Sequence, residues 1–186
     1  MVTESGNGIA GGSVTAREAT VLFSATIVIS MVGIFVGIFF FFISSDLAVR
    51  IAAALLVGVV GIISFFRHSV YFRSDQARMG WHQDHPEFQL ETGYANLAIG
   101  IWALAAAVLN LGALACGLVL AIYGTYLLCT LFLHAAEAFS WKENTVPADR
   151  ARAVRSIFFT LFFVLFLFGF AFIGFARAEL VPFVHL

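Results

Sequence analysis

The segment from residue 92 to residue 133 contains no Asp, Glu, Lys or Arg, and most of its residues are apolar. About 20 such residues suffice for one helix to cross the hydrocarbon core of a bilayer. The segment is therefore long enough for two crossings, and Asn110 and Gly112 mark the turn that we expect between them. Because lipid offers the backbone no hydrogen bonds, we expect this part of the chain to form transmembrane helices.

The composition of the whole chain agrees with this expectation. Of its 186 residues, 61% are hydrophobic and 11% are charged, against about 25% charged residues in soluble domains. The net charge of −1 and the absence of a basic tract give no attraction to nucleic acid, so we expect no nucleic-acid partner. No nucleotide-binding loop, nucleophile elbow or paired zinc-binding Cys motif occurs, which disfavours kinase and hydrolase functions.

Hydrophobic runs predict five membrane spans. We expect helices over residues 21–43, 47–71, 87–109, 111–140 and 156–176, with a polar segment at 72–87. The predicted fold is all-α and polytopic: a four-helix transmembrane bundle plus a fifth, Phe-rich transmembrane helix. Residues 1–20 form a polar N-terminal segment, residues 21–178 the transmembrane domain, and residues 179–186 a C-terminal tail.

The Lys and Arg residues beside the spans predict the orientation. Eight lie on the side of the N-terminus and two on the opposite side. The eight are Arg17, Arg67, Arg73, Arg78, Lys142, Arg150, Arg152 and Arg155, and the two are Arg50 and Arg177. Since positive residues stay in the cytoplasm, we expect a multi-pass protein of the cell inner membrane with a cytoplasmic N-terminus and an external C-terminus.

The fourth predicted helix carries one polar stripe. At about 100° per residue, its polar and aromatic positions fall within one sector of the helix: Cys116, Tyr123, Tyr126, Thr130, His134, Glu137 and Trp141. An ionisable side chain in a membrane is costly and usually faces protein or a water-filled cavity. His134 and Glu137 are therefore the first candidates for function. Helix direction also places Arg67, His68 and Glu91 near them, on the cytoplasmic side.

Three interpretations of this cluster remain open. In the first, His68, His134, Glu137 and Glu91 coordinate a transition metal, with zinc, iron or copper suited to such ligands. In the second, His134, Glu137 and Arg67 act on a quinone-like molecule that Tyr123, Tyr126 and Asn96 help to bind. In the third the cluster is structural: Arg67 pairs with Glu137 or Glu91, and His134 bonds a neighbouring helix.

The third predicted helix has two different faces. Gln89, Gly93, Asn96 and Gly100 share one face, where small residues allow close packing and amides bond across helices. Glu87, Glu91, Tyr94 and Ala98 lie on roughly the opposite face. Both faces cannot contact the same neighbour, so Glu91 is the weaker site candidate and would then only complement the helix N-terminus.

Gly80-Trp81 and the segment Phe88-Gln89-Leu90-Glu91-Thr92-Gly93-Tyr94-Ala95-Asn96-Leu97 resemble an uncharacterised family of small DoxX-like bacterial membrane proteins. The signature is Phe-Gln-x-Glu-x-Gly-x-x-Asn-Leu, and the resemblance covers residues 50–140. It implies four helices, with His134 matching a His near the end of the last one. It also implies an association with membrane redox complexes and quinone reduction. The fifth helix departs from the four-helix pattern.

Two functions from different classes follow. The first is a small redox-linked membrane protein whose cluster binds a metal or a quinone-like molecule. The second is a non-catalytic accessory subunit, in which the Phe-rich fifth helix packs against other membrane protein subunits or another copy of the chain. A small-solute or proton transporter is a third possibility, and the lack of an internal repeat counts against it.

Overall fold

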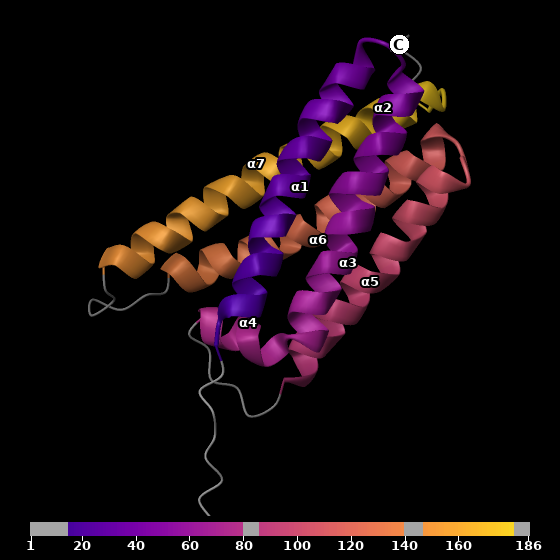
Figure 1. The fold of residues 1–186 in the computed structure, drawn as a ribbon. Coiled ribbons are helices and arrows are strands. Elements are labelled where there is room, and N and C mark those ends of the chain that lie inside the picture. The colour runs from indigo at the N-terminus through magenta and orange to yellow at the C-terminus, as the bar shows by residue number, and fades with distance from the viewer. Residues whose placement is uncertain (1–14, 80–85, 140–146, 181–186) are drawn as a thin grey trace, which may run out of the picture.

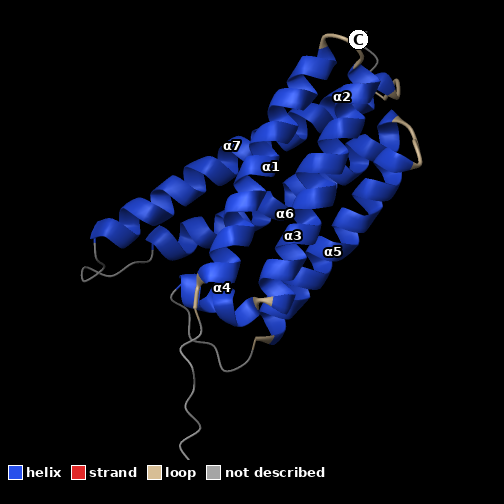
Figure 2. Ribbon diagram, in the orientation of Figure 1, coloured by secondary structure: helices blue, strands red, loops and turns tan. Residues whose placement is uncertain are grey.

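The computed structural model describes residues 15–79, 86–139 and 147–180, and within these ranges the chain is helical and has no strand (Figures 1 and 2). The elements are α1 (Arg17–Phe41), α2 (Ser45–Ala52), η1 (Ala53–Val59), α3 (Val60–Phe65), η2 (Phe66–Val70), α4 (Phe72–Met79), α5 (Glu87–Val108), α6 (Ala113–Phe139) and α7 (Pro147–Arg177). Both η elements are π-helical turns. The residues 1–14 and 181–186 of the predicted terminal segments, and Gly80-Trp81, lie outside the described residues.

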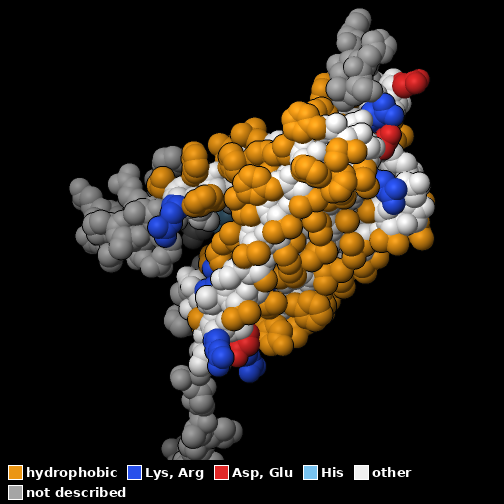
Figure 3. Space-filling model, turned by 45° about the horizontal axis from the view of Figure 1, so that its top comes forward, with side chains coloured by type: hydrophobic (Ala, Val, Ile, Leu, Met, Phe, Trp, Pro, Cys, Tyr) orange, Lys and Arg blue, Asp and Glu red, His pale blue; other side chains and the backbone are white. Residues whose placement is uncertain are grey.

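Four helical segments are long and apolar enough to cross a membrane, and they make the chain a multi-pass membrane protein by length and composition. They are Arg17–Phe41, Ser45–Val70, Ala113–Ala136 and the Phe-rich Val154–Arg177. The predicted third span, α5, is not among them, because Glu91, Tyr94 and Asn96 lower its hydropathy. A total of five spans therefore stays a prediction. Figure 3 shows apolar side chains over the middle of one face and charged ones towards its ends.

The second span is one continuous helical rod from α2 to η2, and α5 packs along it. A Cβ on Gly61 would lie 2.7 Å from the Asn96 carbonyl oxygen, so the two backbones approach each other closely. Gln89, Gly93, Asn96 and Gly100 are all buried in this seam, whereas Glu87, Glu91, Tyr94 and Ala98 lie outside it and are at least partly exposed. The predicted division of α5 into two faces is confirmed. The predicted turn is also confirmed: Asn110 has φ +52° and Gly112 has φ +91°.

Part of the segment predicted as a polar connection, residues 72–87, is a helix: α4 covers Phe72–Met79. The rod ends in the π turn η2, where the Tyr71 N–H donates to the Phe66 carbonyl at 2.8 Å. The short helix α4 follows and lies across the end of the bundle, beside the start of α1 (Figure 1). There the Ser74 hydroxyl accepts from the Ala19 N–H at 3.1 Å and donates to Glu18 at 3.2 Å. Ser74 thus satisfies one of the unpaired N–H groups in the first turn of α1. We refer to this end of the molecule as the α4 end.

Helices α6 and α7 form a hairpin that diverges from the other helices towards the α4 end (Figure 1). Far from that end the hairpin is tight, since a Cβ on Gly174 would lie 2.8 Å from the Gly117 Cα. There Leu120 and Leu167 belong to the core. Towards the α4 end many of its large side chains become exposed, including Phe132, Leu133, Phe158 and Phe159.

Candidate functional site

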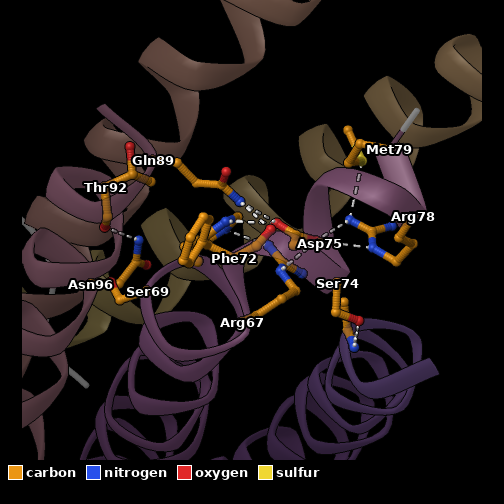
Figure 4. Close-up of polar contacts among 12 residues, drawn as sticks. Arg67, Ser69, Phe72, Ser74, Asp75, Arg78, Met79, Gln89, Thr92 and Asn96 are labelled. Carbon is orange, nitrogen blue, oxygen red and sulfur yellow. Dashed lines mark hydrogen bonds and ion pairs between the residues drawn. The ribbon is translucent and has the colours of Figure 1, made fainter. Parts of the chain in front are cut away.

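The α4 end holds a buried polar cluster centred on Asp75, which we call the Asp75 cluster (Figure 4). The Asp75 side chain is only 1% exposed. Its Oδ2 accepts from His68 Nδ1 at 2.9 Å and from Gln89 Nε2 at 3.3 Å. Its Oδ1 accepts from Arg78 through Nε at 3.1 Å and Nη2 at 3.0 Å, and lies 3.6 Å from Arg67 Nε. Residues from η2, α4 and α5 therefore meet at one carboxylate.

Asp75 is ionised in this environment. Burial by itself raises the pKa of Asp75, because it disfavours the charged form. The hydrogen bond from His68 and the positive charges of Arg67 and Arg78 act in the opposite direction and are stronger together. The net effect is a pKa of Asp75 below its ordinary value, so its negative charge persists at neutral pH.

The contacts of His68 define its proton arrangement. Nδ1 faces the Asp75 carboxylate at 2.9 Å, and Nε2 faces the Arg67 Nη2 at 2.7 Å. A guanidinium only donates, so Nε2 must be the acceptor and Nδ1 must carry the proton. His68 is then neutral and links Asp75 to Arg67. In this arrangement neither ring nitrogen has a lone pair left for a metal ion.

Arg67 has hydrogen-bonding capacity left over. Among the described residues, Nη2 is its only nitrogen with a hydrogen-bond acceptor, while Nε is buried without one. The guanidinium lies 5.5 Å from the centre of the Phe23 ring, and that of Arg78 lies 4.6 Å from it. With His68 neutral, the two guanidinium groups carry one positive charge more than Asp75 neutralises. The cluster is therefore a donor-rich, positively charged site.

A second polar group lies deeper along the same helices. The amide of Asn96, 3% exposed, accepts from the Tyr123 hydroxyl at 3.2 Å and donates to the Tyr126 hydroxyl at 3.2 Å. The two tyrosine rings stack with centroids 6.1 Å apart. The three residues predicted to help bind a ligand are thus together.

The structure separates the other predicted residues from this cluster. His134 is exposed on the diverging part of α6 and is not among the contacts of Asp75. Glu91 is exposed on the outer face of α5, and the side chain of Glu137 lies outside the described residues. Among the described residues, no three His, Cys, Asp or Glu side chains converge as metal ligands. The described members of the predicted metal set therefore do not fit a metal ion.

The sequence analysis missed Asp75 and the role of Arg78, which lie in the segment expected to be a polar connection. One signal was present: Asp75 and Arg78 are three residues apart, the spacing of an ion pair on a helix. Comparison with protein-family models, with curated proteins and with solved structures found no match for the chain. The resemblance to DoxX-like proteins stays a prediction from the residues quoted above.

Proposed function

We propose that this small multi-pass membrane protein binds a quinone-like molecule at the α4 end. Its carbonyl head group would accept hydrogen bonds from Arg67 beside Tyr126. The observation that supports this most is Arg67 itself. Its side chain is only 13% exposed, its charge is only partly neutralised by Asp75, and among the described residues only its Nη2 has a hydrogen-bond acceptor. A carbonyl or anionic oxygen would satisfy the remaining donors, which are costly to leave unpaired in a low-dielectric site.

In this proposal each residue of the Asp75 cluster has a separate task. Arg67 contacts the head group. His68 and Asp75 are positioning residues, because they hold the guanidinium from its Nη2 and Nε sides. Tyr123 and Tyr126 offer hydroxyls and stacked aromatic rings to a flat ligand. Following the resemblance to DoxX-like proteins, we propose a redox-linked role, and following the Lys and Arg distribution we place the α4 end in the cytoplasm.

Titration of the purified protein with a short-chain benzoquinone, in nanodiscs, tests the proposal. We expect the dissociation constant to rise about tenfold or more in Arg67→Gln, the effect of losing hydrogen bonds from a charged donor. The dissociation constant of Arg67→Lys should lie between those of the native protein and Arg67→Gln, because lysine keeps the positive charge but lacks the paired N–H donors of a guanidinium. Arg177→Gln is the control, because Arg177 pairs with Asp46 at 2.9 Å far from the cluster. Equal affinity in all four proteins, with normal thermal unfolding, contradicts the proposal.

A second candidate function is that of an accessory subunit. The observation that favours it is the exposed Phe158, Phe159 and Phe162 in the diverging half of α7. A partner bound there should be lost from gentle detergent extracts of Phe158→Ala/Phe159→Ala protein. It should be retained in Phe35→Ala/Phe39→Ala protein, whose phenylalanines are similarly exposed on α1. Equal recovery from both variants contradicts the subunit role.

A further inference from the structure

An apolar groove lies between α1 and α7, within the two membrane-crossing segments. Its volume is about 460 Å³, in the range of ligand-binding pockets. Its walls include Ile38 and Phe41 of α1 and Phe162, Leu165, Gly169 and Phe170 of α7. Almost all of its lining is apolar, so it suits a hydrocarbon chain and offers nothing to a polar group.

Gly169 keeps this groove open. A Cβ built on Gly169 meets no atom of the described residues within 4 Å. At Gly37, by contrast, the Phe170 ring occupies the space beside the glycine, and its nearest carbon would lie 2.6 Å from an added Cβ. The two helices therefore touch at Gly37 and Phe170, and the space beside this contact is left empty by the missing side chain of Gly169.

Four exposed apolar residues on one side of α1 extend from the groove to the Asp75 cluster. At about 100° per residue, Phe23, Ile27, Met31 and Ile38 lie within a sector of about 80°. All four are more than a third exposed. The Phe23 ring lies against Arg67 and Arg78, and Ile38 is a wall of the groove. The separation from Phe23 to Ile38 corresponds to about 22 Å of helix.

We infer that the α1–α7 groove binds the hydrocarbon tail of the molecule whose head group contacts Arg67. The inference rests on the proposed function and specifies the class of ligand. The ligand must carry an isoprenoid or alkyl tail long enough to run about 22 Å along α1. Divergence of the α6–α7 hairpin towards the α4 end leaves the exposed face of α1 available for such a tail (Figure 1).

The test uses a benzoquinone with a long isoprenoid tail that carries a diazirine at its far end, in nanodiscs. We expect photolabelling of residues 162–173, and unlabelled long-tailed quinone should compete for it. Gly169→Leu should lower this labelling about tenfold, the effect of displacing about two methylenes, and should leave short-chain quinone binding unchanged. Leu161→Phe is the matched control, a larger side chain on α7 outside the groove.

Two results overturn the inference and are distinguishable from failure of the proposed function. In the first result, the diazirine quinone labels all the exposed apolar faces and unlabelled quinone does not compete. Such labelling shows only that the tail is dissolved in the lipid around the protein. The second result uses a phospholipid that carries a diazirine in its acyl chain. If it labels residues 162–173 as strongly as the long-tailed quinone does, and if Gly169→Leu lowers both labellings equally, the groove binds lipid chains in general. If short-chain quinone does not bind at all, the proposed head-group site fails instead.

Discussion

Substitution of Asp75 by Asn is the sharpest test of the cluster, because it removes a charge with almost no change in shape. In Asp75→Asn the remaining side-chain oxygen can still accept from Arg78. The new amide nitrogen replaces Oδ2 and faces two donors, His68 Nδ1 and Gln89 Nε2. Two guanidinium groups also lose their counter-charge. Removing one partner of a buried ion pair costs about 3–5 kcal/mol, and the partial exposure of Arg67 and Arg78, 13% and 20%, favours the lower value.

We therefore expect Asp75→Asn to lower the free energy of unfolding by about 3 kcal/mol, or Tm by about 6–12 °C. Thermal unfolding in detergent, followed by circular dichroism, measures this. Asp46→Asn is the control: the side chains of Arg177 and Asp46 are 36% and 51% exposed, so this pair should contribute less than about 1 kcal/mol.

The pH dependence follows from the lowered pKa of Asp75. A carboxyl whose pKa is lower in the folded protein stabilises it above the unfolded pKa of about 3.9, and this stability is lost as pH falls through the folded pKa. The Tm difference between native and Asp75→Asn protein should thus have its largest value at pH 7 and should decrease below about pH 4. Equal Tm values for Asp75→Asn and Asp46→Asn at pH 7 would refute the reasoning.

Three further predictions concern the surrounding residues. Tyr123→Phe removes the hydrogen bond to Asn96 and should lower stability by about 0.6–1.7 kcal/mol, as is usual between membrane helices; denaturant or thermal unfolding checks it. Gly93→Ala should cost about 1–3 kcal/mol, because its Cβ collides with the Ser69 hydroxyl, whereas Gly169→Ala should be neutral; the same unfolding assay compares them. His68→Gln should leave the transition-metal content unchanged in elemental analysis, since both ring nitrogens are already engaged, and a metal lost in this variant would contradict the assigned contacts.

The long helices were predictable, because their apolar runs and the Asn110 and Gly112 turn are local signals. The inward face of α5 was also predictable from the spacing of Gln89, Gly93, Asn96 and Gly100. The short helix α4 was not, because its eight residues are largely polar and no hydrophobic period marks them. Its burial depends on contacts with Arg67, His68 and the start of α1, which no local pattern encodes.

The polar stripe of α6 shows the same limit. Its periodicity correctly placed Tyr123 and Tyr126 on the inner face, where both meet Asn96. The same stripe continues to His134, yet His134 is exposed, because α6 leaves the bundle before reaching it. Periodicity predicts which side of a helix a residue occupies. It does not predict how far along the helix a neighbour remains beside it.

The divergence of α6 and α7 has a mechanical consequence. The hairpin is fastened at one end by the Gly117 and Gly174 contact, and its opposite half leans away from the other helices. A leaning helix pair spans less of the bilayer normal than an upright pair of the same length. In a thicker membrane, matching the hydrophobic length favours the upright position, which brings the hairpin closer to α1. Bilayer thickness would then control how far the α4 end of the hairpin lies from α1.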